Sequence, residues 1–181
     1  KIDVDEINKV INIKKLEKDG RVFIYSDKKI QSWEINFNSK VNVKQNTSLS
    51  SSLESLDGCI TIYESKIEDI NINTNNGICE DSVNIIRSQG NIKKINIINS
   101  FKDGLDMDFS NIKINEININ NSGNDCVDMS FGNYIISSLN LNECKDNAVS
   151  IGEKSNLVSN DLNVKNSLNG LAVKDSSKVN L

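Results

Sequence analysis

Hydrophobic and polar residues alternate along most of the chain, and the alternation repeats with a period of 22 residues. Each repeat begins at an Asp or Asn, in the series Asp81, Asp103, Asp125, Asn147 and Asn169. The next residue is always small, and the residues two and four positions after the anchor are apolar, as in Val127 and Met129. Alternation with a period of two is typical of β-strands, whose successive side chains point to opposite faces. Each repeat therefore predicts a short strand whose residues two and four positions after the anchor point into a core.

A second strand per repeat is indicated by apolar residues on both sides of an asparagine, as in Ile95-Asn96-Ile97. A third, shorter strand is indicated by pairs such as Ile112 and Ile114. Three short strands per 22 residues, with Asn, Gly and Ser at the corners, predict one coil of a parallel β-helix. The sequence therefore predicts an all-β solenoid in which each coil buries its inward side chains against its neighbours.

Regular coils are predicted over residues 57–181, beginning with "DGCITIYES", in which Ile60 and Ile62 point inward. Residues 1–56 are predicted to form a less regular N-terminal part of the same domain, with strands in "VFIY", "SWEINFN" and "VNV". A loop is predicted over "NTSLSSSLESLDG", residues 46–58. Trp33 is expected either to plug the end of the stack or to pack in an early coil. Because the repeat continues to the last residues, we expect the chain to be part of a longer polypeptide.

Composition narrows the possible partners. The chain has a formal net charge of −4 and a pI near 5.0, which disfavours nucleic acid because phosphate binding needs a basic patch. No apolar run approaches the roughly 20 residues of a membrane helix, so no membrane insertion is expected. The absence of histidine excludes Ser-His-Asp and Cys-His mechanisms within this chain.

The cysteines show no CxxC spacing, at Cys59, Cys79, Cys126 and Cys144. Four cysteines are too few for a disulfide scaffold in a chain of this size. We therefore expect them to be buried, reduced thiols that act as small hydrophobic side chains.

Asparagines also repeat in a column, at Asn96, Asn118, Asn140 and Asn163. In parallel coils about 4.8 Å apart, such amides can hydrogen-bond from one coil to the next. We interpret the column as a structural ladder; the alternative is a polar strip that faces a sugar.

Carboxylates gather on two neighbouring coils at positions that face outward. Asp106 and Asp128 occupy the same position on successive repeats, with Cβ atoms expected on the order of 5 Å apart. Asp108 lies two residues beyond Asp106 on the same face, and Asp103 and Asp125 stand at the preceding corners. Like charges at this spacing repel, so a bound cation, a basic neighbour or a raised pKa must compensate.

Three interpretations of this acidic group stay open. Asp106, Asp108 and Asp128 are candidate ligands for a hard cation such as calcium. Carboxylates about 5 Å apart also suit glycoside chemistry. The candidate catalytic residues are then Asp103, Asp106, Asp125 and Asp128. The third interpretation is a solvated face on which corner aspartates cap turns and Lys102 and Lys145 supply positive charge.

The coils resemble the right-handed parallel β-helix repeat proteins of bacteria over residues 57–181. The resemblance rests on "CEDSVNIIRS" (79–88), "DGLDMDFS" (103–110), "GNDCVDMS" (123–130), "DNAVSIGEKS" (146–155) and "NGLAVKDSSKV" (169–179). It implies a right-handed parallel β-helix (solenoid) with coils of about 22 residues. Some members of this group are modules of large secreted or surface polypeptides, and others are carbohydrate-active enzymes.

A closer comparison is with the polygalacturonases, which "FKDG" (101–104), "GNDC" (123–126), "DNAVSIG" (146–152) and "LAVK" (171–174) resemble. By this resemblance Asp103 and Asp125 match two catalytic aspartates of that family. However, Asn124 replaces the aspartate expected as general acid, which must carry a titratable proton. Asn147 replaces the family's histidine and Ala172 its arginine. The resemblance therefore implies shared architecture without the polygalacturonase mechanism.

Two functions follow as expectations. The first is a non-catalytic β-helix module of a larger protein, serving as a rigid scaffold or a polysaccharide-binding platform. The alternative is a polysaccharide lyase, epimerase or hydrolase that uses the Asp106, Asp108 and Asp128 face, with calcium as a candidate cofactor. The few aromatic residues, 5% of the chain, and the lack of a basic residue clearly beside the acidic group favour the first. The expected partners are polysaccharide or other domains of the parent polypeptide. The family resemblance favours an extracellular or cell-surface location, whereas unpaired cysteines also fit the cytoplasm.

Overall fold

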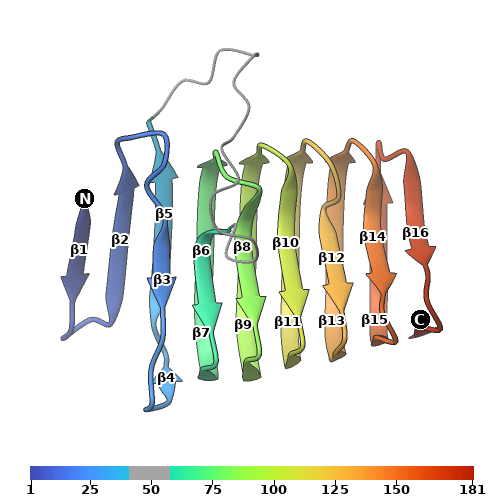
Figure 1. Cartoon of the computed structure of the whole chain (residues 1–181), viewed down its shortest axis with the longest axis horizontal. Coiled ribbons are helices and arrows are strands. Elements are labelled where there is room, and N and C mark those ends of the chain that lie inside the picture. The colour runs from blue at the N-terminus through green and yellow to red at the C-terminus, as the bar shows by residue number, and fades with distance from the viewer. Residues whose placement is uncertain (41–57) are drawn as a thin grey trace.

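The computed structural model describes residues 1–40 and 58–181, and every regular element in these ranges is a β-strand. The strands form a β-solenoid of about seven turns, whose parallel coils follow each other about 22 residues apart (Figure 1). The predicted all-β parallel solenoid is thus confirmed. The described part of the chain holds no helix able to cross a membrane.

The longer strands form a ten-stranded sheet, termed sheet A. In pairing order its main path is β1 (Ile2–Asp5), β2 (Val10–Lys15), β5 (Glu34–Ser39), β7 (Lys66–Gly77), β9 (Gln89–Ser100), β11 (Asn111–Ser122), β13 (Asn133–Cys144), β15 (Asn156–Lys165) and β17 (Lys178–Asn180). A further strand, β4 (Ile30–Gln31), pairs with β7 off this path. All pairs are parallel except the first, in which β1 lies antiparallel to β2.

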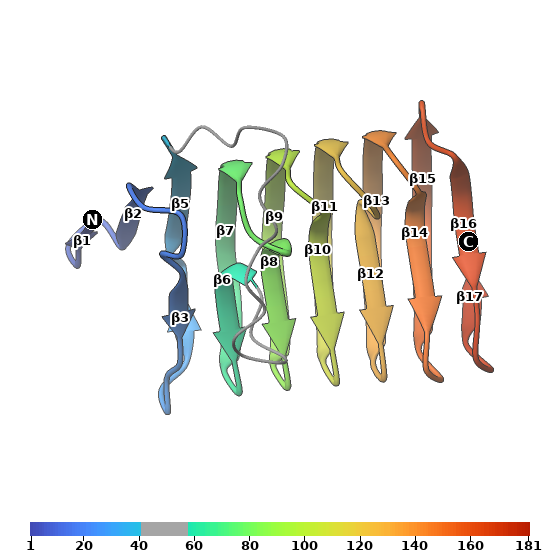
Figure 2. The ribbon, with the colours of Figure 1, turned by 45° about the horizontal axis from the view of Figure 1, so that its top comes forward.

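The shorter strands form a seven-stranded parallel sheet, termed sheet B. In chain order it contains β3 (Val22–Ile24), β6 (Gly58–Tyr63), β8 (Asp81–Ile86), β10 (Asp103–Asp108), β12 (Val127–Ser130), β14 (Asn147–Gly152) and β16 (Asn169–Val173). Figure 2 shows the successive coils stacked along the long axis of the molecule. Each strand therefore bonds to the strands of the coils before and after it.

The register of the sheets is the one that the repeat predicts. Leu105 pairs with Val127, and Met107 with Met129. These four side chains are fully buried, as are Ile60 and Ile62 of the earlier coil. The residues two and four positions after each anchor thus form one continuous core, in which dispersion and the hydrophobic effect hold neighbouring coils together.

The N-terminal part is less regular, as expected. Strand β3 lies within "VFIY" and β5 within "SWEINFN". Trp33 is partly buried and packs against the core, which agrees with its packing in an early coil. The predicted strand "VNV" and the predicted loop, apart from Gly58 at its end, lie outside the described residues.

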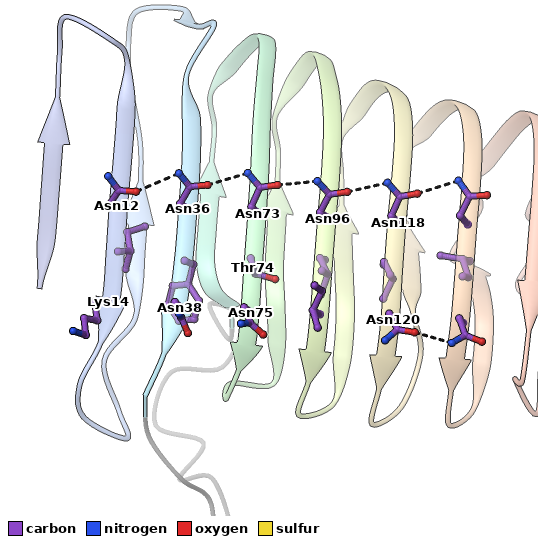
Figure 3. Close-up of a pocket in the computed structure, with 18 of the residues that line it drawn as sticks. Asn12, Lys14, Asn36, Asn38, Asn73, Thr74, Asn75, Asn96, Asn118 and Asn120 are labelled. Atoms are coloured by element: carbon purple, nitrogen blue, oxygen red, sulfur yellow. Dashed lines mark hydrogen bonds between the residues drawn. The ribbon is translucent and has the colours of Figure 1, made fainter.

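The asparagine column is a continuous hydrogen-bonded ladder on sheet A (Figure 3). Each Nδ2 donates to the Oδ1 of the preceding coil at 2.8–3.2 Å, along Asn12, Asn36, Asn73, Asn96, Asn118, Asn140 and Asn163. The predicted ladder is therefore confirmed, and it extends into the irregular N-terminal coils. Because each amide donates a hydrogen bond to the amide of the preceding coil, the ladder fixes the register of neighbouring strands on the half-buried outer face of sheet A.

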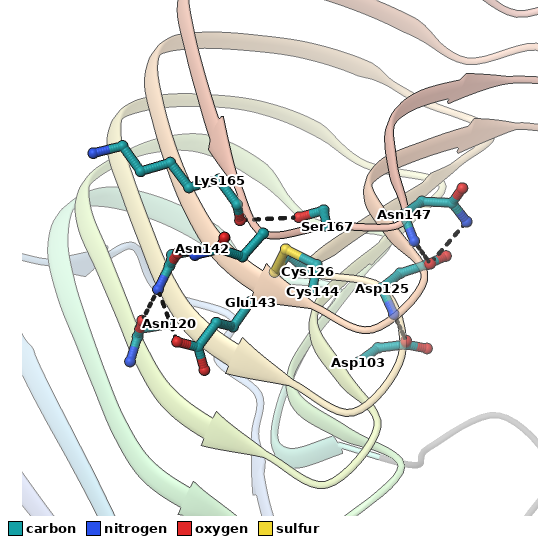
Figure 4. Close-up of a disulfide and its surroundings, with 11 residues drawn as sticks. Asp103, Asn120, Asp125, Cys126, Asn142, Glu143, Cys144, Asn147, Lys165 and Ser167 are labelled. Atoms are coloured by element: carbon teal, nitrogen blue, oxygen red, sulfur yellow. Dashed lines mark hydrogen bonds between the residues drawn. A yellow bond between two sulfur atoms is a disulfide. The ribbon is translucent and has the colours of Figure 1, made fainter.

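The expectation of reduced cysteines is wrong. Cys59 forms a disulfide with Cys79, with a Cα–Cα distance of 5.4 Å. Cys126 forms one with Cys144, with a Cα–Cα distance of 5.3 Å (Figure 4). In each bridge the first cysteine stands at the small-residue corner where a sheet B strand begins. The second cysteine follows 20 residues later (Cys79) or 18 residues later (Cys144), where the chain has gone round the coil and comes back to that corner. Short-range spacing could not reveal these pairs, because only the coil geometry brings the two corners together.

The same corner is closed differently in another coil. Ser82 and Ser100, two repeats before Cys126 and Cys144, are buried, and the Ser82 hydroxyl donates to Ser100 Oγ at 2.8 Å. A hydrogen bond therefore occupies the place of a disulfide.

We expect the double substitution Ser82→Cys/Ser100→Cys to form a third disulfide and to raise the free energy of unfolding by about 1–2 kcal/mol. Titration of free thiols in the denatured, unreduced protein should find none, and chemical denaturation should show the gain. The single variant Ser82→Cys is the control and should expose one thiol without the gain. Two titratable thiols in the double variant would contradict the proposed equivalence of the corners.

Candidate functional site

The candidate site lies on the outer surface of sheet B. Asp106 on β10 pairs in register with Asp128 on β12, so the predicted placement of these carboxylates on adjacent coils is confirmed. Asp108 follows on β10 and pairs with Ser130. All three aspartates are only partly exposed. We call Asp106, Asp108 and Asp128 the acidic face.

Two buried polar side chains lie on either side of the pair Asp106 and Asp128 along sheet B. On one side Asn84, only 2% exposed, donates from Nδ2 to Asp106 Oδ2 at 2.8 Å. On the other side Ser150, fully buried, pairs in register with Asp128. Within the described residues, Asn84 Oδ1 has no hydrogen-bond partner, whereas Ser150 lowers the pKa of Asp128 by interacting with its carboxylate as a hydrogen-bond donor. The surface therefore offers an unused hydrogen-bond acceptor at the Asn84 end of the acidic pair.

Burial dominates the electrostatics of the acidic face. It raises the pKa of Asp106 far above its ordinary value, and the negative charges of Asp81, Asp108 and Asp128 raise it further. Burial is also the main cause of the raised pKa values of Asp108 and Asp128. None of the three forms a salt bridge within the described part of the chain. Of the three compensations considered, the structure therefore supports a raised pKa.

The predicted compensation by Lys102 is weak, because this lysine bonds to Glu80. Lys174 lowers the pKa of Asp128, but burial outweighs its effect. The acidic face is therefore a group of carboxyls with little positive charge nearby, which favours holding protons or binding hydrogen-bond donors.

The corner aspartates have a structural role. Asp103 Oδ1 accepts hydrogen bonds from the backbone N–H of Asp125 and from Asn124 Nδ2, both at 2.8 Å. Asp125 Oδ1 accepts from the backbone and side chain of Asn147, also at 2.8 Å (Figure 4). Burial raises the pKa of Asp103 to about 6. These two candidate catalytic residues thus connect successive coils, and their catalytic role stays a prediction.

Exposed aromatic rings border the acidic face. Phe109 and Phe131 follow β10 and β12 at the same corner of successive coils and are 50% and 47% exposed. Their rings stack with centroids 4.6 Å apart and planes 5° from parallel. The Arg87 guanidinium lies 5.9 Å from the centre of the Phe109 ring. It also donates to the hydroxyl of Tyr63 at 2.9 Å.

This cluster was not predicted from the sequence, where the aromatic residues were weighed only by their small number. The available signal was positional, since Phe109 and Phe131 are 22 residues apart and follow the acidic strands directly. A parallel solenoid stacks residues one repeat apart, so two rings at this spacing form one surface. We call Phe109, Phe131 and Arg87 the aromatic corner.

No set of three or more Asp, Glu, Cys or His side chains among the described residues is arranged to hold a metal ion. The register nevertheless brings the proposed ligands Asp106, Asp108 and Asp128 onto one surface. The calcium hypothesis therefore stays a prediction.

The fold and this surface define a parallel β-solenoid with an acidic and aromatic outer face. No family model matches the chain, and no curated protein or solved structure is significantly similar to it. The class of the protein is therefore set by its fold.

Proposed function

We propose that this chain is a non-catalytic solenoid module that binds polysaccharide on the acidic face and the aromatic corner. The observation that carries the proposal is the stacked, half-exposed pair Phe109 and Phe131 beside outward carboxylates. The apolar C–H face of a sugar ring packs on an aromatic ring, while its hydroxyls donate to carboxylates. One surface thus offers both kinds of contact that a sugar chain needs.

The charge of the surface selects the type of sugar. A uronic acid would add negative charge beside Asp106, Asp108 and Asp128, whose raised pKa values show that this surface already disfavours negative charge, so its binding is unfavourable unless a cation bridges the two. Neutral sugars and amino sugars meet no such repulsion. We therefore propose neutral or amino-sugar polymers as the ligand of this face.

The rest of the chain suits a rigid extracellular platform. Disulfides form and persist in oxidising compartments, so the two bridges support a secreted or cell-surface location. The asparagine ladder and the continuous core hold the binding residues on strands and at their corners. A rigid surface binds with less loss of conformational entropy than a flexible one.

Replacing both rings, as Phe109→Ala/Phe131→Ala, is expected to weaken polysaccharide binding at least ten-fold, because each exposed ring contributes about 1 kcal/mol of packing. Affinity gel electrophoresis against xylan, mannan, β-glucan and chitosan measures the change. Phe101→Ala is the matched control, since this exposed ring belongs to a different corner of the coil. Equal retention of the double variant and the wild type, or no retention of the wild type by any polymer, would refute the proposal.

A second candidate function, a carbohydrate-active enzyme, is favoured by one observation. Burial raises the pKa of Asp103 to about 6 and raises that of Asp106 further, close to a third carboxyl, Asp128, and unequal proton affinities among neighbouring carboxyls are typical of acid and base pairs. An assay for new reducing ends and unsaturated uronate ends separates the two functions. Product formation that disappears in Asp106→Asn would replace the binding proposal with the enzymatic one.

A further inference from the structure

A long groove runs along the outer face of sheet A, away from the strands that carry the acidic face. Its volume is about 1470 Å³, and residues from β1 to β15 line it (Figure 3). Its floor follows the asparagine ladder, and a second outward column borders it two residues further along each strand. That second column contains Lys14, Asn38, Asn75, Ile98, Asn120, Asn142 and Lys165. We call this feature the amide groove.

The two columns differ in their free hydrogen-bonding capacity. In the ladder, Asn118 Nδ2 donates both to Asn96 Oδ1 at 2.8 Å and to Glu116 Oε1 at 2.9 Å, so its donors are committed. In the second column, the side-chain N–H groups of three residues have no hydrogen-bond partner within the described ranges. These residues are Asn38, Asn75 and Asn120. The groove thus presents unused amide donors on separate coils.

The groove is basic although the whole chain is acidic. Lys1, Lys14 and Lys40 line one end and Lys165 lines the other, whereas Asp3 is the sole acidic residue in the lining among residues 1–40 and 58–181. The side-chain interaction with Lys40 and its positive charge lower the pKa of Lys14, so these two cations lie close together. The lining therefore complements a ligand that carries negative charge.

The spacing of the coils limits the ligand further. Strands in one sheet lie about 4.8 Å apart, so the seven strands of the ladder span about 29 Å. One sugar residue of an extended glycan is comparable in length to this separation of the coils. A linear glycan parallel to the solenoid axis would therefore meet an equivalent site at every coil.

We propose that the amide groove binds a linear anionic polysaccharide. Sugar oxygens accept hydrogen bonds from Asn38, Asn75 and Asn120, and carboxylate or sulfate groups pair with Lys14, Lys40 and Lys165. Single-stranded nucleic acid fits less well because its binding sites depend on exposed aromatic rings. Phe37, the one aromatic side chain that the described part of the chain contributes to the lining, is buried. This site does not depend on the acidic face and selects the opposite charge.

The test compares charge reversal inside and outside the groove. We expect Lys14→Glu/Lys165→Glu to weaken binding to polygalacturonate, hyaluronate or heparin at least ten-fold at low salt. The control Lys113→Glu/Lys145→Glu makes the same change in net charge at exposed positions outside the lining and should bind like the wild type. Affinity gel electrophoresis at two salt concentrations provides the measurement.

A second readout locates the bound polymer. Titration of the wild type with an oligomer of the bound acidic polysaccharide should shift the side-chain amide signals of Asn38, Asn75 and Asn120 in ¹⁵N-resolved NMR spectra. Phe109→Ala/Phe131→Ala should leave these shifts unchanged, which separates this site from the proposed one on sheet B. Equal weakening by the two lysine pairs, no binding by the wild type, or tighter binding of oligo(dT) than of any acidic glycan would overturn the proposal.

Discussion

Replacing Cys126 by alanine and Cys144 by serine is expected to lower the free energy of unfolding by about 3 kcal/mol, the chain-entropy value for a loop of roughly 18 residues. The bridge closes one coil on itself, so its loss frees the unfolded chain while the folded coil keeps its other contacts. The neighbouring coils already carry small residues at these two positions. Gly104 and Ala148 correspond to Cys126, and Ser122 corresponds to Cys144. The substitutions should therefore fit without strain.

Chemical denaturation at constant pH measures this loss, and thermal unfolding should show a fall of about 6–12 °C. A reducing agent should destabilise the wild type by at least as much, because it also opens the Cys59–Cys79 bridge. A variant without any of the four cysteines is the control and should not respond to reductant. Four titratable thiols in the denatured, unreduced wild type would show that the bridges do not form.

The second large effect concerns Asp106. Asp106→Asn is expected to stabilise the protein by on the order of 2 kcal/mol at pH 8, because it removes a carboxylate that burial and four neighbouring aspartates disfavour. The new amide would stand beside Asn84, whose Nδ2 already donates to this position. The substitution thus extends on sheet B the kind of amide pair that forms the ladder on sheet A.

The pH dependence has a definite sign. The pKa values of Asp103, Asp106, Asp108 and Asp128 are all raised in the folded state, so the folded chain binds these protons more tightly than the unfolded chain. Their contribution to stability is complete below about pH 4 and declines as the pH rises through the folded-state pKa values. For Asp103 the decline falls between about pH 4 and about pH 6.

Denaturation midpoints from pH 4 to pH 8 test this account. The wild type should lose stability toward pH 8, and Asp106→Asn should flatten the curve and match the wild type near pH 4. Asp175→Asn is the control, since that carboxylate is exposed and should leave the curve unchanged. A wild-type protein that gains stability between pH 5 and pH 8 would contradict the raised pKa values.

Local pattern was sufficient to predict the regular coils. The 22-residue period placed Asp106 opposite Asp128 and aligned Asn96 with Asn118, and the register agrees in both cases. A solenoid makes this possible because every strand pairs with the strand one repeat away, so position in the repeat determines the contact. The irregular N-terminal coils, which lack a fixed period, were predicted only as separate strands.

Other features depended on contacts within a coil. The pairing of Cys126 with Cys144 follows from the path of the chain around the coil, which the 22-residue period does not contain. The stacking of Phe109 on Phe131 required the outward direction of both side chains at the corner after each strand. The amide groove required the second outward column to lie beside the ladder.

The sequence by itself therefore determined the solenoid, its register and the columns of like residues, because a fixed repeat turns sequence spacing into spatial neighbours. The tertiary structure alone decided which corners of a coil meet, which carboxylates are buried and which surfaces are left to bind a ligand. These properties depend on how far each side chain is removed from water and on the groups across the coil from it, and neither is set by position in the repeat.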